Sequence, residues 1–86
     1  MMRQILFHRQ AMEDFDRWLC EKPVVHERIR RLIKETAEHP FEGIGKPEPL
    51  RHELAGYWSR RITDEHRLVY KVTDESIIIA SCRYHY

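Results

Sequence analysis

The sequence predicts an α+β domain in which one antiparallel sheet packs on two helices, in the order β-α-α-β-β-β. Two features of the 86 residues support this. Apolar side chains recur every three or four positions in the first half, as in amphipathic helices. Runs rich in β-branched and aromatic residues, joined by short polar links, fill the last third of the chain. We expect a single domain that spans residues 1–86.

The first half should hold one short strand and both helices. Residues 5–7 form the strand, and helices run over residues 10–21 and 24–39. Pro23 marks the break between the helices and Pro40 ends the second, because proline lacks the N–H that a helix interior needs. The apolar stripes expected to face the core are Met12, Phe15 and Leu19, with Trp18 beside them, and then Val25, Ile29, Leu32, Ile33 and Thr36.

The segment "PFEGIGKPEPL", residues 40–50, differs in composition from the predicted helices that precede it. It holds two glycines and three prolines, a composition that favours an irregular loop over a helix or a central strand. Three strands should follow, over residues 57–62, 66–73 and 76–86.

The register of these strands decides which side chains share a face of the sheet. A hairpin that pairs Ile62 with His66 places Arg61 opposite Arg67. The next link is either a two-residue turn at 74–75 or a three-residue link at 74–76. We favour three residues, because that register keeps charges away from the core. The helix-packed face then carries Trp58, Ile62, Leu68, Tyr70, Val72, Ile78, Ala80 and Cys82, and the other face carries Ser59, Arg61, Arg67, Lys71, Ser81, Arg83 and His85.

The second of these faces is strongly basic although the net charge is only +1. Antiparallel sheets commonly leave one face in water, so a solvated face is one interpretation. Like charges placed directly opposite each other are unfavourable, however. Arg61 across from Arg67 therefore favours a site for an anion or a phosphate.

Several classes of protein do not fit the composition. No apolar run is long enough to cross a membrane, and "MMRQILF" lacks the features of a signal peptide, so we expect a cytoplasmic protein. Cys20 and Cys82 are expected to be reduced and buried. "GIGKP" departs from the phosphate-binding P-loop pattern, and no cysteine–histidine spacing indicates zinc. We therefore expect neither a metal nor another cofactor.

One carboxylate and one imidazole could add chemistry to the basic face. Glu48 is held stiffly between Pro47 and Pro49, which suits a positioned base but equally a structural connector. His85 lies next to the last residue, where an idle histidine is common. Together with the arginines they suit cleavage of an RNA phosphodiester. A base would activate the 2′-hydroxyl, arginines would stabilise the transition state, and a histidine would protonate the leaving oxygen.

Residues 40–86 closely resemble the Txe/YoeB family of bacterial toxins, within the wider RelE/ParE superfamily. The resemblance rests on the motifs "GKPEPL", "WSRRI", "EHRLVY" and the terminal "CRYHY". It implies a RelE-like, microbial-RNase-like fold and the toxin half of a type II toxin–antitoxin pair. The implied activity is metal-independent endonucleolytic cleavage of translated mRNA at the ribosomal A site.

The resemblance also assigns roles by position. Glu48 resembles the general base, Arg67 the ligand of the phosphate and transition state, His85 the general acid, and Tyr86 a residue that positions the substrate. The implied partners are a YefM-type antitoxin and mRNA on the 70S ribosome, with a homodimer as a further possibility. The residues expected to contact RNA phosphates are Lys46, Arg51, Arg61 and Arg83.

Two other functions stay open at this stage. ParE-type relatives share the fold but inhibit DNA gyrase, and they have no chemical need for the set Glu48, Arg67, His85 and Tyr86. A non-catalytic module that binds RNA or the ribosome would need the basic face without the acid and the base.

Overall fold

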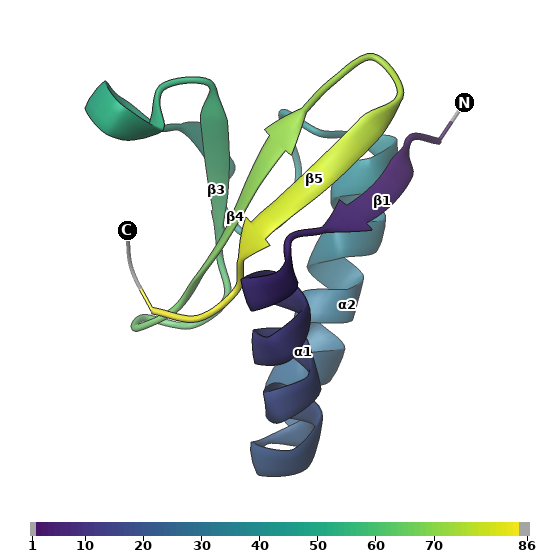
Figure 1. Cartoon of the computed structure of the whole chain (residues 1–86), viewed down its shortest axis with the longest axis vertical. Coiled ribbons are helices and arrows are strands. Elements are labelled where there is room, and N and C mark those ends of the chain that lie inside the picture. The colour runs from purple at the N-terminus through teal and green to yellow at the C-terminus, as the bar shows by residue number, and fades with distance from the viewer. Residues whose placement is uncertain (1, 85–86) are drawn as a thin grey trace.

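A five-stranded sheet and two helices form the two layers of the molecule (Figure 1). The computed structural model describes residues 2–84. Helices α1 (Arg9–Glu21) and α2 (Pro23–Glu38) lie side by side on one face of the sheet. The predicted α+β architecture is confirmed. The strands are β1 (Gln4–Phe7), β2 (Glu48–Pro49), β3 (Tyr57–Arg61), β4 (Arg67–Val72) and β5 (Ser76–Ser81), in the spatial order β1-β5-β4-β3-β2, and a short 3₁₀ turn covers His52–Leu54.

The sheet differs from the prediction at both of its edges. Strand β1 pairs in parallel with β5, so the sheet is mixed and the expectation of a purely antiparallel sheet was wrong. A long connection through both helices makes this parallel pairing possible. At the other edge, Glu48 and Pro49 of the proline-rich loop form the short strand β2, which pairs with β3. An edge strand tolerates proline because one side of its backbone needs no partner.

The link between β4 and β5 corrects the predicted register. Thr73 pairs with Ser76 around a two-residue turn, so the three-residue link was wrong. Tyr70 then lies opposite Ile79 and Val69 opposite Ser81, which leaves Ala80 as the extra residue of a β-bulge. A bulge changes which side chains share a face. Ile77 and Ile79 enter the core in place of the predicted Ile78 and Ala80, whereas Cys82 is buried as predicted.

Helix α2 buries the predicted side chains, but α1 is rotated relative to the prediction. Ile29, Leu32, Ile33 and Thr36 are all buried, and Val25 packs against the cluster. In α1, Ala11, Asp14 and Trp18 are buried, whereas Met12 and Leu19 are exposed. The indole Nε1 of Trp18 donates to the carbonyl of Cys82 at 2.9 Å. Burying this large ring with its polar atom satisfied favours the face that contains Trp18.

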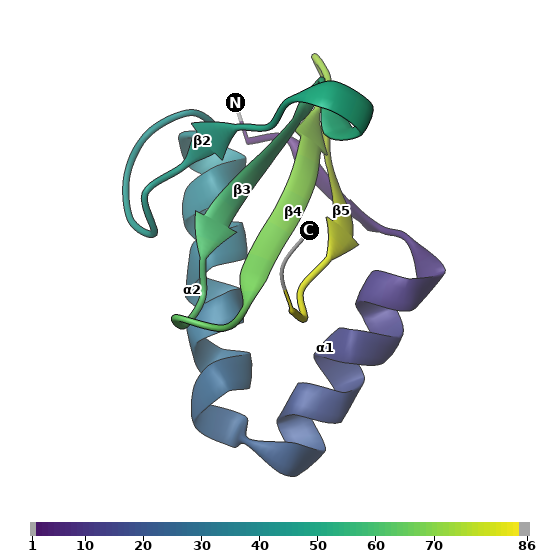
Figure 2. The same cartoon turned by 90° about the vertical axis from the view of Figure 1, so that its left-hand side faces the viewer.

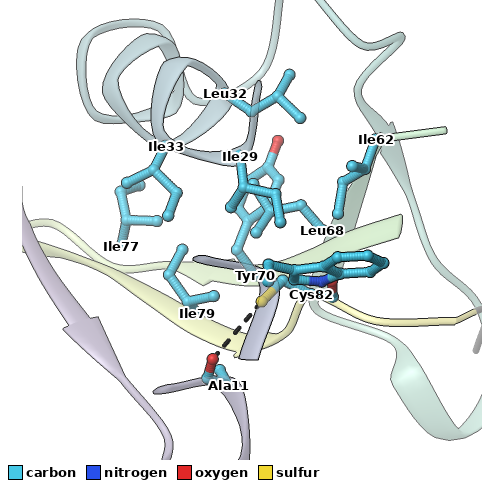
Figure 3. Close-up of a cluster of buried hydrophobic side chains, with 11 residues drawn as sticks. Ala11, Ile29, Leu32, Ile33, Ile62, Leu68, Tyr70, Ile77, Ile79 and Cys82 are labelled. Atoms are coloured by element: carbon cyan, nitrogen blue, oxygen red, sulfur yellow. Dashed lines mark hydrogen bonds between the residues drawn. The ribbon is translucent and has the colours of Figure 1, made fainter. Parts of the chain in front are cut away.

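The core lies between the sheet and the helices (Figure 3). Tyr70 and Leu68 of β4 and Ile77 and Ile79 of β5 meet the apolar side of α2 there. The thiol of Cys82 lies within 3.5 Å of the carbonyl oxygen of Ala11. Trp58 and Tyr70 lie on the helix-packed face as predicted, with Tyr70 in the core cluster and Trp58 packed against it.

Both cysteines are free thiols. Cys82 is buried as predicted, but Cys20 is exposed, so the expectation of two buried thiols was half wrong. Within residues 2–84, neither helix has the length and apolar composition needed to cross a membrane.

Candidate functional site

Figure 2 shows the face of the sheet that points away from the helices. The register of β3 and β4 places Arg61, Arg67 and Lys71 on it, as predicted. We call it the outer face and define it by Ser59, Arg61, Arg67, Val69 and Lys71. The structure confirms that Arg61 lies directly opposite Arg67 and Ser59 opposite Val69. Ser59 is 1% and Val69 4% exposed, so the middle of this face is closed to solvent, whereas Arg61 and Lys71 are exposed. The backbones of Arg61 and Arg67 pair at one end of the face.

Glu48 lies exposed on β2, at the edge of the same face. It pairs with Ser59, two residues along β3 from Arg61. Typical strand spacing and rise place the Cα atoms of Glu48 and Arg67 roughly 12 Å apart, which leaves room for a phosphodiester between the side chains. Glu48 and Arg51 together line a hollow of about 330 Å³. Lys46 precedes them, exposed and with a left-handed backbone at φ 50°.

A buried arginine, to which the sequence pattern gave no role, holds the loop that precedes Glu48 in the chain. Arg60 lies on β3 between the core-facing Trp58 and Ile62, and it is completely buried. Its guanidinium donates to the hydroxyl oxygen of Tyr70 and to three loop carbonyls, those of His39, Glu42 and Ile44. The sequence does carry a signal for this role: a charged residue stands at a position of β3 that alternation places on the core side of the sheet.

The next residue of β3 adds a further bond to this loop. The backbone N–H of Arg61 donates to the carbonyl of Gly45 at 2.6 Å. The approach is so close that a Cβ atom on Gly45 would lie 2.9 Å from Leu32 Cδ2. The loop that leads to Glu48 is thus fixed to the sheet by hydrogen bonds from the buried Arg60 side chain and from the backbone of Arg61.

Arg67 is held by the turn that precedes it. Its Nη1 donates to the carbonyls of Thr63 at 2.7 Å, His66 at 3.0 Å and Asp64 at 3.2 Å. Within residues 2–84, Nε and Nη2 of this side chain form no hydrogen bond. The guanidinium is therefore oriented in advance, with two nitrogens left for an anionic ligand.

The chain that follows β5 is bound to the body of the protein at three successive residues. The carbonyl oxygen of Cys82 accepts a hydrogen bond from the indole N–H of Trp18. Arg83 pairs with Glu21 of α1 at 2.9 Å, and its guanidinium lies 4.4 Å from the centre of the Trp18 ring. Tyr84 donates its N–H to Nδ1 of His66 at 2.7 Å. Residues 82–84 are thus held far more firmly than residues near a chain terminus usually are.

The position of Arg83 differs from the prediction. We expected it on the face of Arg67, but its side chain turns to α1 and contacts Trp18 and Glu21. Strand β5 ends at Ser81, so Arg83 no longer has to follow the alternation of the strand, and stacking on the indole accounts for its direction. His85 and Tyr86, the predicted acid and substrate-positioning residue, lie outside the described residues.

Charge and burial shift the pKa values of three groups near this segment. The hydrogen bond from Arg83 holds the pKa of Glu21 below its usual value, and the same bond raises the pKa of Arg83. Burial, with a smaller contribution from Asp14, raises the pKa of the Cys82 thiol to about 12. Cys82 is therefore a protonated structural thiol at neutral pH.

Among residues 2–84, no three or more histidine, cysteine, aspartate or glutamate side chains are grouped as metal ligands would be. The groups that the structure does bring to one face are the carboxylate of Glu48 and the two facing arginines, Arg61 and Arg67. Such a set can bind a phosphate and move protons around it.

Comparison with known proteins gives consistent results. Residues 7–86 match the family described as the YoeB-like toxin of bacterial type II toxin–antitoxin systems. Toxin YoeB of Escherichia coli K12 is 52% identical over 83 residues, which cover 96% of this chain and 99% of that protein. The solved YoeB dimer of Staphylococcus aureus is 46% identical, with a TM-score of 0.92 and full coverage of both chains. The heterotetrameric YoeB–YefM complex of the same organism gives a TM-score of 0.89 at the same identity and coverage.

Proposed function

This chain belongs to the YoeB-like family of type II toxins, and we propose that it is a ribosome-dependent endoribonuclease that cleaves translated mRNA at the A site. The observation that carries the proposal is Arg61 facing Arg67 across β3 and β4, with Glu48 at the edge of the same face. Two cations held opposite each other repel unless an anion lies between them. A phosphodiester of the message is the anion that fits this arrangement.

The proposed reaction needs one base, one acid and a cationic clamp. Glu48 takes the proton from the 2′-hydroxyl, and the oxygen attacks the adjacent phosphorus. The bond from phosphorus to the 5′-oxygen breaks, and His85 gives that oxygen its proton. The products are a 2′,3′-cyclic phosphate and a free 5′-hydroxyl, so atoms and protons balance. Histidine is suited to the acid role because its ordinary pKa lies near neutrality.

Arg67 is the proposed ligand of the phosphate. The turn carbonyls that hold its Nη1 fix the guanidinium before the substrate arrives. Groups oriented in advance stabilise a transition state without reorganising at the moment of reaction. Tyr86 would position the substrate, and Arg51, Arg61 and Lys46 would contact neighbouring phosphates. Arg83 contributes least in this proposal, since its guanidinium already pairs with Glu21.

The proposed partners follow from the solved relatives. The structures from S. aureus are named as a YoeB dimer and a heterotetrameric YoeB–YefM complex. We therefore propose that a YefM-type antitoxin binds and inhibits this chain, and that the free toxin forms a homodimer. Mixing with the antitoxin should abolish cleavage.

The decisive experiment adds the purified protein to translating ribosomes on a defined message and maps new 5′ ends by primer extension. Cuts at the A-site codon should appear with the wild type and disappear with Glu48→Gln and with His85→Gln. Matched controls are Glu53→Gln and His8→Gln, which change exposed residues outside the proposed site and should cut normally. Wild-type cutting by both site variants would refute the roles of acid and base. Growth arrest without any cutting would refute the nuclease and call for a gyrase supercoiling assay.

A further inference from the structure

His66 forms an unusual contact that the proposed reaction does not use. It directly precedes β4 and is 8% exposed. Its Nδ1 accepts a hydrogen bond of 2.7 Å from the backbone N–H of Tyr84. A backbone N–H can only donate, so Nδ1 must carry a lone pair. The imidazole is then in the form that carries its proton on Nε2.

Tyr84 needs such support because its backbone conformation is strained. Its φ is 62°, in the left-handed region, where a residue with a Cβ costs about 1–2 kcal/mol. A second bond opposes this strain, since the N–H of Arg67 donates to the carbonyl of Tyr84 at 3.1 Å. We call these two bonds the tail clasp: His66 Nδ1 and Arg67 N on one side, and the N–H and carbonyl of Tyr84 on the other.

The imidazole ring of His66 is itself fixed by its neighbours. Trp18 meets it edge to face at 4.8 Å, and the Tyr84 ring lies at 5.2 Å. Its backbone carbonyl accepts from the N–H of Ile62 at 3.0 Å. Among residues 2–84, Lys22, Asp64 and Glu65 line the pocket that adjoins this ring, and Arg67 follows it in the chain. Arg83, which pairs with Glu21, packs on the Trp18 ring that His66 contacts.

We propose that His66 is a positioning residue, whose Nδ1 lone pair holds Tyr84 and thereby places the last two residues for the reaction. The inference deepens the proposed function, because it concerns the segment that carries the proposed acid. The clasp joins Tyr84 to His66 and Arg67, so the proposed phosphate ligand and the residue that precedes the proposed acid share one support. Misplacing a catalytic group by about 1 Å can cost roughly 100-fold in rate.

Two substitutions separate the hydrogen bond from the packing. His66→Phe keeps a ring against Trp18 and Tyr84 but removes the acceptor, whereas His66→Asn keeps an acceptor oxygen near the position of Nδ1. In His66→Phe we expect the Tyr84 amide to exchange its hydrogen roughly tenfold faster or more. We also expect kcat for message cleavage to fall roughly 10- to 100-fold with KM nearly unchanged. His66→Asn should recover part of both losses.

The wild-type protein supplies a test that needs no variant. Imidazole ¹⁵N shifts at neutral pH should show Nδ1 unprotonated and Nε2 protonated, and the form with a proton on Nδ1 would overturn the proposal. Unchanged exchange of the Tyr84 amide in a folded His66→Phe would also overturn it. If the wild type does not cleave at all, the proposed function fails, while the exchange rates and ¹⁵N shifts still decide whether His66 holds the chain end.

Discussion

The guanidinium of Arg60 donates from Nε to the hydroxyl oxygen of Tyr70 at 3.2 Å, and that hydroxyl donates in turn to the carbonyl of Pro40 at 2.8 Å. Both side chains are completely buried. A charge in the core is tolerated only when its donors are satisfied, and here loop carbonyls satisfy them. The pair therefore links the core of the sheet to the loop that ends at Glu48.

Tyr70→Phe should destabilise the protein by about 1–3 kcal/mol, because it leaves Arg60 Nε and the carbonyl of Pro40 without their partner. Urea unfolding at neutral pH measures the loss. The control is Tyr57→Phe, whose hydroxyl makes no hydrogen bond within residues 2–84 and which should change stability little. Equal losses in the two variants would show that the buried bonds contribute nothing.

Gly45→Ala should cost more stability than Gly56→Ala. Both glycines have positive φ, 82° and 95°, so both substitutions strain the backbone by about 1–2 kcal/mol. Only at Gly45 would the new Cβ meet Leu32, Arg60 and the carbonyl of Arg61, at 2.9 to 3.2 Å. We expect an additional loss of about 1–3 kcal/mol there. Similar midpoints of urea unfolding in the two variants would contradict the close approach of the loop to β3.

Much of this fold could be predicted from the sequence, because the spacing of apolar residues indicates which side chains are buried. The stripe of α2 follows from the helical spacing of its apolar residues, and the pairing of Arg61 with Arg67 follows from the short link between two strand-like runs. The bulge at Ala80 could not be predicted, because an extra residue in one strand leaves no signal in a two-residue period. The rotation of α1 was missed for a similar reason, since the tertiary bond from Trp18 to Cys82 outweighs the local stripe.

The candidate site likewise contains some residues that the sequence indicates and others that it does not. Glu48 stood out because two prolines flank it, and Arg67 because of its place in the register. The residues that hold the site in place gave no such signal. Arg60 and His66 act through backbone carbonyls and a backbone N–H, and these partners are identical at every position of a sequence. Only the folded chain shows which carbonyls lie within reach of a guanidinium.

The thiol of Cys82 should make the protein less stable at alkaline pH. Its pKa rises on folding from the ordinary 9.0 to about 12, chiefly through burial. The unfolded chain therefore loses this proton first, and stability present below pH 9 is lost as the pH rises towards 12, by up to about 4 kcal/mol. Urea unfolding between pH 8 and pH 11 should show a shallower decline for Cys82→Ala than for the wild type.

Cys20→Ala is the matched control, because that thiol is exposed. Its alkaline decline should parallel that of the wild type. A thiol reagent at pH 8 should modify Cys20 quickly and Cys82 only on unfolding. Rapid modification of both thiols in the folded protein would contradict the burial of Cys82.

The Arg83–Glu21 pair should stabilise the protein only above acidic pH. The bond lowers the pKa of Glu21 in the folded chain, so its contribution is present above the ordinary value of 4.5 and is lost as the pH falls below it. Glu21→Gln should therefore unfold at a lower temperature than the wild type at pH 7. As the pH falls below 4.5 the two melting temperatures should approach each other, and a constant difference across this range would refute the linkage.

Arg61→Gln should raise stability while it weakens binding to RNA. Removing one of two facing cations relieves repulsion across β3 and β4, worth about 0.2–1 kcal/mol. Added salt should shrink that gain, because screening already weakens the repulsion in the wild type. The lost cation should reduce affinity for a short single-stranded RNA and lower the slope of log affinity against log salt.

Arg31→Gln is the comparison, since it removes the same charge from an exposed position on α2. It should leave both RNA affinity and the salt slope nearly unchanged. If Arg61→Gln destabilised the protein and bound RNA as the wild type does, the facing arginines would be a structural feature of the sheet and not a phosphate site. If both variants weakened binding equally, net charge alone would explain the affinity. Only a loss confined to Arg61→Gln, together with a gain in stability, fits a site that keeps two cations opposed for an anion.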